Sequence, residues 1–547
     1  MIRRALPCLA LTAAALVAAP PRPKLVVVIS IDQFSADLLA RCGKDLPGGL
    51  GRLEREGVWF TDAYQAHGIT ETGPGHSVLL SGRYPAHTGI PENEWRDETT
   101  GRLTYCVADG RVSALPTHEG QEPPAGSSMS QVWFQGTTLG DWLQRQRPGA
   151  RAFSVSYKDR AAILMAGRHP SGVFWMDGAN GFTTSTAYAN RLPDWLLAFD
   201  ATLRQGWARG PIVWSGGDRT AFPARAGAAY DINGQTVRMG LPRRILAVGD
   251  ALDGTFIDRY RATPFLDEVT LRAAEALIAH EKLGQGPSTD LLTVSLSATD
   301  FIAHFYGTFG PEMADHLAKL DAALGRFLDV LKAQDPGVWV ALSADHGGSD
   351  LPERLAEMGY PARRIPAGAW VQTLDQALRT QWKLQGPALL PGTSADMLYL
   401  SDAAIRAAGS KDAAEAQAAA LAKRMDGIAD AFPGYQLRQT QVDLKADPAS
   451  FSLAQRMALS YVPGRSGDVI VAWKPYIGWS SKPPYLEDHG APWDFDRRVP
   501  LIFWGPWKAG ERPEPVALVD LAPTLAKELG IKPEEPLDGV PLELPLP

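Results

Sequence analysis

Runs of β-branched residues recur along the chain and predict buried strands. Lys24-Leu-Val-Val-Val-Ile-Ser-Ile31 is apolar in succession rather than in alternation, which is typical of a strand covered on both faces in a parallel sheet. Residues 291–297 and 338–343 have the same pattern. Segments of helical periodicity lie between or beside these strands, at 139–146, 266–282 and 313–333. Strands that alternate with helices predict an α/β fold with a central, mostly parallel sheet flanked by helices.

Two long segments, 203–262 and 350–465, interrupt this alternation. The second contains an Ala-rich stretch, 403–424, whose mixed-charge polar positions predict one helix. We interpret both segments as insertions that cap the core of one elaborated domain, which runs from residue 24 to 547.

The first residues have the layout of a secretory signal peptide. Two arginines precede an apolar run over 5–19, and prolines follow it, so we expect residues 1–19 to be removed on export. The run is short for a bilayer span, although an uncleaved N-terminal anchor is an alternative. No later stretch is long and apolar enough. We therefore expect a periplasmic or secreted protein with no stable membrane span after signal removal.

Composition argues against one class of binding partner and does not decide whether the cysteines form a disulfide. Lys and Arg number 54 against 61 Asp and Glu, so the net charge of −7 argues against a nucleic-acid-binding surface. Hydrophobic residues make up 45% of the chain and 16 are Trp, which indicates extensive buried packing. The cysteines are Cys8, Cys42 and Cys106. Loss of the signal peptide would leave Cys42 and Cys106 either as a disulfide or as two buried thiols.

An aspartate follows each of the three predicted strands: Asp32, Asp300 and Asp345. Because the carboxyl ends of parallel strands meet at one edge of a sheet, these side chains should lie close together. A single Asp at a strand end is most often a turn residue or a helix cap. Their recurrence at matching strand ends favours a shared site.

Three histidines complete a plausible ligand set. His304 lies four residues after Asp300, on the same side of a helical turn, and His346 directly follows Asp345. His489 lies in a late Asp-His-Gly-Ala segment. A lone His-Gly, as at His346 and His489, is usually a loop histidine, but three carboxylates and three imidazoles suit two zinc ions that need roughly three protein ligands each.

Thr72 is the candidate nucleophile. It lies in Thr70-Glu-Thr-Gly-Pro-Gly-His76, where Gly-Pro-Gly predicts a tight bend and residues 76–81 predict the first turns of a helix. The hydroxyl would then face the positive end of the helix dipole, and a metal ion would favour its alkoxide. The alternative is a Thr that only caps the helix.

Two cations lie close together in the sequence near residue 160. Ser156-Tyr-Lys-Asp-Arg160 follows a strand-like segment, and in extended chain Lys158 and Arg160 point the same way while Asp159 faces away. Both could then reach one anionic group. The alternative is a solvated charge cluster.

The order of these motifs resembles the alkaline phosphatase superfamily: strand-Asp, Thr-Gly-Pro-Gly-His, Asp-xxx-His, Asp-His-Gly and a late His-Gly. Within it the chain is similar to bacterial alkaline phosphatases with a Thr nucleophile, which resemble the nucleotide pyrophosphatase/phosphodiesterases. The resemblance extends from Lys24 to Gly539. It implies an alkaline phosphatase-like fold and two zinc ions per chain. One zinc would be held by Asp300, His304 and His489, the other by Asp32, Asp345, His346 and Thr72.

The same resemblance implies a phosphate monoesterase that releases inorganic phosphate through a phosphothreonine at Thr72. Asn93, which could otherwise be an exposed turn residue, matches the position that hydrogen-bonds a phosphoryl oxygen. The Lys158-x-Arg160 pair resembles that of the monoesterases, and the diesterase relatives lack it. Two zinc ions, three carboxylates and an alkoxide sum to about zero charge, so this pair would supply about +2 opposite a dianion.

Three alternatives remain at this point. A phosphodiesterase or nucleotide pyrophosphatase would use the same scaffold, and a non-catalytic metal- or phosphate-binding relative is more remote. A sulfatase is disfavoured because no Cys/Ser-x-Pro-x-Arg segment occurs at Thr72. The sequence predicts neither the leaving group nor the oligomeric state.

Overall fold

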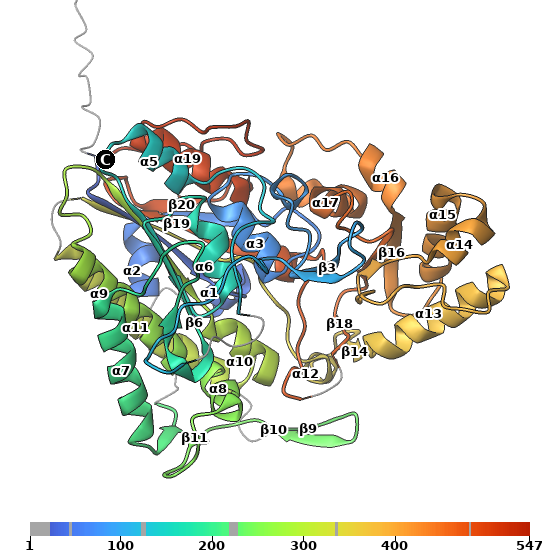
Figure 1. The fold of residues 1–547 in the computed structure, drawn as a ribbon, viewed down its shortest axis with the longest axis horizontal. Helices are drawn as coiled ribbons and strands as arrows, with labels where there is room; N and C mark the ends of the chain where they lie inside the picture. The colour runs from blue at the N-terminus through green and yellow to red at the C-terminus, as the bar shows by residue number, and fades with distance from the viewer. Residues whose placement is uncertain (1–21, 43–45, 122–126, 218–227, 334–336, 481–482) are drawn as a thin grey trace, which may run out of the picture.

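The fold is built on one large central sheet (Figure 1). The computed structural model describes residues 22–42, 46–121, 127–217, 228–333, 337–480 and 483–547. Among these residues the strand order is β20 (Gly510–Arg512), β2 (Val58–Tyr64), β19 (Arg498–Trp504), β13 (Val338–Ser343), β1 (Leu25–Ile31), β12 (Asp290–Leu296), β5 (Ala152–Ser156), β6 (Gly172–Met176) and β7 (Phe182–Thr183), with β21 (Val516–Ala517) beside β2.

The middle of the sheet is parallel, as the sequence predicts. Strands β13, β1, β12, β5 and β6 run in one direction, whereas β19 and β7 are antiparallel to their neighbours. Every residue of β1 is buried, which accounts for its unbroken apolar run. The prediction of an α/β fold with a mostly parallel central sheet is confirmed.

Helices cover the sheet on both sides (Figure 1). Helix α5 (Leu139–Gln146) has the predicted bounds, and α9 (Phe265–Glu281) and α11 (Pro311–Lys332) lie within two residues of theirs. At the start of α5, the Asp141 carboxylate accepts the backbone N–H of Thr138 at 2.9 Å, which fixes the first turn. Helices α9 and α11 pack on each other, while α3 (Thr72–Leu79) packs on α6 (Asp159–Ala166).

The prediction of one helix over 403–424 is wrong. Two helices, α14 (Asp402–Ala408) and α15 (Lys411–Ala422), occupy this stretch. Gly409 has φ of 95°, a left-handed conformation that ends α14. The Ser410 side chain then caps α15 by accepting the N–H of Ala413 at 3.1 Å. The Ala-rich composition on both sides of this Gly-Ser break concealed it.

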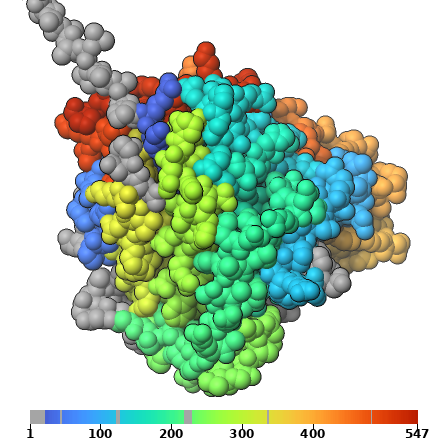
Figure 2. All heavy atoms as spheres, turned by 60° about the vertical axis from the view of Figure 1, so that its left-hand side comes forward, coloured from blue at the N-terminus to red at the C-terminus, as the bar shows by residue number. Residues whose placement is uncertain are grey.

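The two segments predicted as insertions differ in how they pack. Much of 350–465 lies in the yellow-to-orange lobe at the right of Figure 1, which has a buried cluster of its own around Trp370 and Leu374. The small sheet of this lobe includes β17 (Val469–Trp473), just beyond the predicted range. Within 203–262, α8 (Gly254–Arg261) packs on α9, whereas Tyr230 and Ile232 cluster with Leu351 and Leu486. In Figure 2 the green surface of this segment is continuous with the lime surface beside it.

The predicted signal peptide, residues 1–19, lies outside the described residues. Among the residues described, no helix has the length and apolarity to cross a bilayer. Cys106 is a free, buried thiol, so the disulfide alternative is not realised at this residue.

Candidate active site

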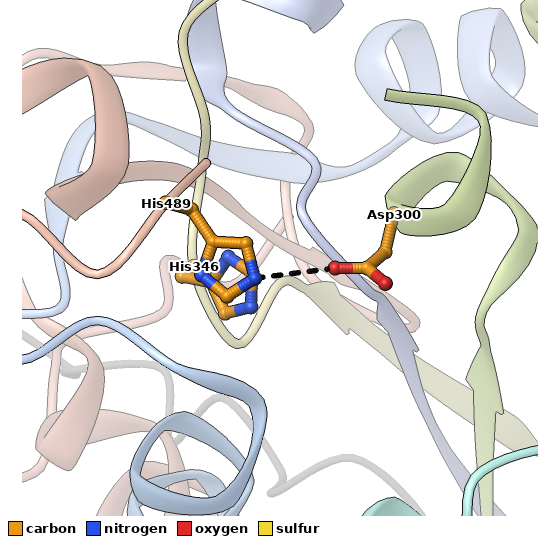
Figure 3. A group of neighbouring side chains, drawn as sticks. All are labelled: Asp300, His346 and His489. Atoms are coloured by element: carbon orange, nitrogen blue, oxygen red, sulfur yellow. Dashed lines mark ion pairs between the residues drawn. The ribbon is translucent and has the colours of Figure 1, made fainter. Parts of the chain in front are cut away.

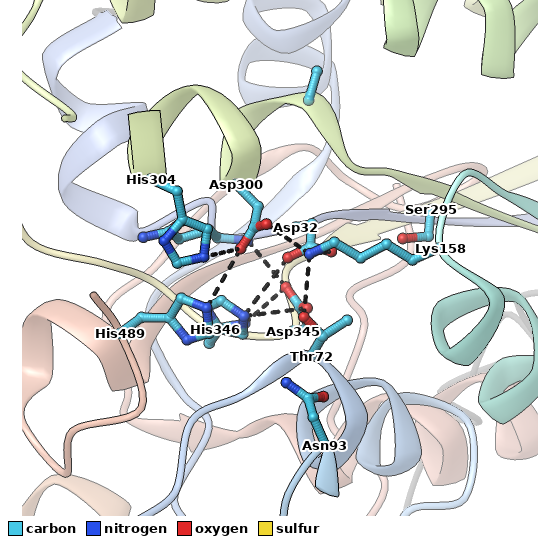
Figure 4. Close-up of polar contacts among 12 residues, drawn as sticks. Asp32, Thr72, Asn93, Lys158, Ser295, Asp300, His304, Asp345, His346 and His489 are labelled. Carbon is cyan, nitrogen blue, oxygen red and sulfur yellow. Dashed lines mark hydrogen bonds and ion pairs between the residues drawn. The ribbon is translucent and has the colours of Figure 1, made fainter. Parts of the chain in front are cut away.

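The sheet register brings the three aspartates together (Figure 4). Ser30 of β1 pairs with Ser295 of β12 on one side and with Ser343 of β13 on the other, so these three strands end at nearly the same level of the sheet. Asp32 follows β1 directly, Asp345 lies two residues after the end of β13, and Asp300 lies in the first turn of α10 (Ala298–Tyr306). Each of the three carboxylates is at most 1% exposed.

The histidines surround these carboxylates in two groups. The Nε2 atoms of His304 and His489 lie 3.5 and 3.4 Å from Asp300 Oδ1. His346 Nε2 lies 3.6 Å from Asp32 Oδ1 and 3.5 Å from Asp345 Oδ2. The structure thus brings together all six side chains that the sequence proposes as ligands.

His346 also borders the other group. Its ring stacks on that of His489 with centroids 3.8 Å apart, and both rings face Asp300 in Figure 3. By distance alone His346 therefore belongs with Asp300 and His489 as well as with Asp32 and Asp345. The Nε2 atom of His304 also faces Asp300, and α10 carries both residues.

Each of the three histidines has the tautomer that a metal ligand needs. The Nδ1 atoms of His304, His346 and His489 lie 2.7–2.9 Å from the backbone carbonyl oxygens of Glu487, Gly347 and Thr70. Because a carbonyl oxygen only accepts hydrogen bonds, each Nδ1 carries the proton, and Nε2 keeps a lone pair when the ring is neutral. For His489, burial lowers the pKa, but Asp300 outweighs it and raises that pKa above the ordinary value. Burial lowers the pKa of His346 to about 3, so this ring is neutral at physiological pH.

The unpaired atoms of this cluster fit a divalent metal. Asp32 Oδ1, Asp300 Oδ1 and His346 Nε2 are buried and have no hydrogen-bond partner among the described residues. Unsatisfied buried polar atoms are costly, and these converge on one small space. Carboxylate oxygens with imidazole nitrogens are a donor set typical of zinc.

Lys158 lies between two of these carboxylates. Its Nζ atom is 2.8 Å from Asp32 Oδ2 and 2.7 Å from Asp300 Oδ2. Burial would raise the pKa of Asp300, but Lys158 and His304 outweigh it and hold that pKa well below the ordinary value. For Asp32, burial and the nearby Asp345 outweigh Lys158 and raise the pKa well above the ordinary value. Burial and the crowding of carboxylates thus disfavour the ionised form of Asp32, which bound cations would restore.

Thr72 begins helix α3, and the predicted bend after it is wrong. Gly-Pro-Gly forms the first turn of the helix, where Pro74 loses no intrahelical hydrogen bond because first-turn N–H groups have no partner. A side chain at Gly75 would place its Cβ 2.1 Å from the carbonyl oxygen of Asp345, so glycine permits the close approach of helix and ligand loop. Thr72 is fully buried and its hydroxyl faces the cluster.

Lys158 and Arg160 converge on Thr72 by a different route from the predicted one. The chain is not extended here: β5 ends at Ser156, Lys158 is the residue before α6, and Arg160 lies in its first turn. Lys158 Nζ and Arg160 Nη2 each lie 3.2 Å from Thr72 Oγ1. Lys158 is only 5% exposed, which argues against the alternative of a solvated charge cluster.

Asn93 is held so that only its amide NH₂ group is free to bind a ligand. Its Oδ1 accepts the backbone N–H of Gly73 at 2.7 Å, which fixes which side-chain atom is oxygen, because an N–H group only donates. Its backbone N–H donates to Glu71 Oε2 at 2.7 Å, and its carbonyl accepts from Cys106 at 2.8 Å. The amide nitrogen and the Thr72 hydroxyl lie on the same side of α3 (Figure 4).

Sequence reasoning missed the residues that support this cluster. Gln33 has φ of 59°, unusual for a non-glycine residue, and its N–H donates to Asp345 Oδ1 at 3.1 Å. Its side chain donates to Glu487 at 2.8 Å. His76, quoted in the Thr72 motif without a role, lies 2.9 Å from both the Thr72 carbonyl and Ser295 Oγ. Only His76 carried a sequence signal, its place in the motif.

The chain has relatives along nearly its whole length. Residues 26–491 match the family described as type I phosphodiesterase / nucleotide pyrophosphatase. The chain is similar to alkaline phosphatase PhoD of Zymomonas mobilis, at 34% identity over 93% of this chain and 85% of the relative. It is also similar to alkaline phosphatase PhoK of Sphingomonas sp, at 33% identity over 96% of this chain and 92% of the relative.

The architecture has a counterpart among solved structures. The crystal structure of wild-type alkaline phosphatase PafA superimposes with a TM-score of 0.81 and 24% identity, covering 96% of this chain and 99% of that one. The likeness extends over nearly the whole length of both chains. It confirms the fold that the strand and motif order predicts.

Proposed function

The chain belongs to the type I phosphodiesterase/nucleotide pyrophosphatase family, and from this premise we propose that it is an alkaline phosphatase that hydrolyses phosphate monoesters through a phosphothreonine at Thr72. Relatives named alkaline phosphatase support this reaction. The observation that carries the proposal is the pair of cations, Lys158 and Arg160, each with a nitrogen 3.2 Å from Thr72 Oγ1. A phosphate monoester dianion has the charge to use both.

We infer that two zinc ions bind the cluster. Asp300, His304 and His489 would hold one, and Asp32, Asp345 and His346 the other, with Thr72 beside it. When bound, two such ions supply Lewis-acid stabilisation of the attacking and leaving oxygens. The unpaired buried ligand atoms and the Nε2 lone pairs support this assignment.

The protein's own groups would act in two steps. In the first, Thr72 Oγ1 loses its proton and forms a bond to phosphorus while the ester oxygen leaves with the bonding electron pair. Lys158, Arg160 and the Asn93 amide would hold the non-bridging oxygens, which is the electrostatic positioning on which phosphoryl transfer mostly depends. In the second, water attacks the phosphothreonine, releases inorganic phosphate and restores the Thr72 hydroxyl.

A diesterase on the same scaffold is the second candidate, because the family includes nucleotide pyrophosphatases. A diester carries a single negative charge and a second substituent on phosphorus, so it gains less from two cations than a dianion does. The burial of Lys158 strengthens this discrimination, because charge interactions are screened less away from water.

The wild-type enzyme is expected to prefer the monoester. We expect kcat/KM for an aryl phosphate to exceed that for the matching methyl aryl phosphodiester by at least ~10²-fold, because one extra charge contact is worth up to ~4 kcal/mol. Steady-state kinetics on zinc-reconstituted protein, with both substrates on the same preparation, measure the ratio. A ratio below one would contradict the proposed phosphatase activity and would favour the phosphodiesterase.

Metal removal is expected to cost both activity and stability. Dialysis against a chelator should abolish hydrolysis and lower the melting temperature, because the carboxylates would be left close together with fewer counterions. Element analysis of the reconstituted protein should give two zinc ions per chain. Magnesium alone, which prefers octahedral oxygen ligands, is the control and should restore little. Full activity in protein free of zinc would contradict the proposed metal centre.

A further inference from the structure

A short hairpin beside the site carries a tyrosine with no role so far. Strands β3 (Glu94–Arg96) and β4 (Leu103–Tyr105) pair so that Glu94 lies opposite Tyr105. The hairpin therefore begins directly after Asn93 and ends at Tyr105. The side chain of Tyr105 is partly buried, and nothing in the sequence singles it out.

Tyr105 links the hairpin to the cation that faces Thr72. Its hydroxyl donates to Asp159 Oδ1 at 2.5 Å and accepts a hydrogen bond from Arg160 Nη1 at 3.1 Å. Arg160 Nη2, the other arm of the same guanidinium, is the atom 3.2 Å from Thr72 Oγ1. Burial raises the pKa of Tyr105 well above its ordinary value, so the phenol is neutral and keeps its proton for Asp159.

The guanidinium has few other restraints. Among the described residues, Arg160 Nε is buried without a hydrogen-bond partner. Tyr105 thus supplies the side-chain contact on Nη1, and Thr72 the one on Nη2. The sequence predicts that Asp159 faces away from the site. Its carboxylate instead accepts a hydrogen bond from the Tyr105 hydroxyl, which in turn contacts Arg160.

We propose that Tyr105 is a positioning residue that fixes Arg160 against the phosphoryl group and thereby sets the preference for dianionic monoesters, an inference that rests on the proposed phosphatase activity. The planar guanidinium binds two partners in fixed directions, so holding one arm aims the other. Asn93 directly precedes the hairpin, and Tyr105 ends it. The hairpin therefore connects the Asn93 amide with Arg160, which Tyr105 contacts, and both are proposed to bind the phosphoryl group.

The test is a double-mutant cycle with Tyr105→Phe and Arg160→Ala. We expect Tyr105→Phe to lower kcat/KM for an aryl phosphate about tenfold and to change that for the methyl diester less than about twofold. In the Arg160→Ala background the same change should cost less than about twofold. Asp159→Asn, which removes the charge that holds the phenol, should lower the monoester value in the same direction.

Tyr399→Phe is the matched control. The Tyr399 hydroxyl donates to the Arg465 carbonyl at 2.8 Å and accepts the backbone N–H of Arg96 in β3 at 3.1 Å. This variant therefore removes comparable support from the same hairpin without touching Arg160. It should leave the monoester-to-diester ratio unchanged. A similar drop in that ratio would show that hairpin stability, rather than Tyr105, sets the preference.

Binding of inorganic phosphate separates this inference from the proposed function. Calorimetry on the zinc-loaded protein should show phosphate binding about tenfold more weakly to Tyr105→Phe than to wild type. If Tyr105→Phe weakens phosphate binding by this factor but the wild-type protein does not hydrolyse monoesters, the proposed function fails while the role of Tyr105 stands. Equal losses for monoester and diester, or additive losses in the cycle, overturn the role of Tyr105.

Discussion

Replacing Thr72 with alanine is expected to reduce kcat/KM for an aryl phosphate by at least ~10⁴-fold, since removal of a single nucleophile from a covalent mechanism typically costs that much or more. The side chain is fully buried at the start of α3, and Lys158 and Arg160 both face it. The binding groups for the phosphoryl oxygens remain in this variant. Phosphate affinity should therefore fall far less than turnover, as a comparison of inhibition constants would measure.

Thr72→Ser is the matched control because it keeps the hydroxyl and removes only a methyl group. It should retain activity within about a hundredfold of wild type. Mass spectrometry of acid-quenched enzyme should find phosphate on residue 72 in wild type and in this variant. Zinc content has to be the same in all three proteins for the comparison to hold. Near-native turnover by Thr72→Ala with full zinc would refute the covalent route.

Much of the site follows from sequence because its ligands lie at the ends of strands. Asp32, Asp300 and Asp345 each follow a strand that the apolar pattern identifies, and the parallel register of β12, β1 and β13 makes their proximity inevitable. The helical spacing of His304 from Asp300 adds a fourth side chain by local geometry alone. Local pattern and simple topology suffice for these residues.

The supporting residues were beyond prediction because their partners lie far away in the chain. Gln33 contacts Glu487, and Tyr105 contacts Asp159, through hydrogen bonds that no local pattern encodes. The path of Lys158 and Arg160 was mistaken for a related reason. Their spacing fits both a strand and the start of a helix, and only the packing of α6 on α3 decides between them.

Removing the cation pair is expected to erase the substrate preference rather than to abolish activity. In Lys158→Ala/Arg160→Ala we expect kcat/KM for the aryl phosphate to fall by ~10³-fold or more, because each cation is worth up to ~4 kcal/mol against a dianion before desolvation is counted. The diester presents one charge and should lose less than about tenfold. Kinetics with both substrates on one preparation measure the change in ratio, and the diester serves as the internal control for intact zinc and fold.

Arg191→Ala controls for the loss of a positive charge far along the chain from the site, because Arg191 is exposed and pairs only with Asp194 three residues away among the described residues. It should leave both substrates unaffected, since exposed charges are screened within about 10 Å at ordinary salt. An equal loss of monoester and diester activity in the double variant would have a different meaning. Lys158 contacts Asp32 and Asp300 as well as Thr72. Such a loss would therefore assign Lys158 to assembling the metal cluster, and it would rule out the cation pair as the source of substrate discrimination.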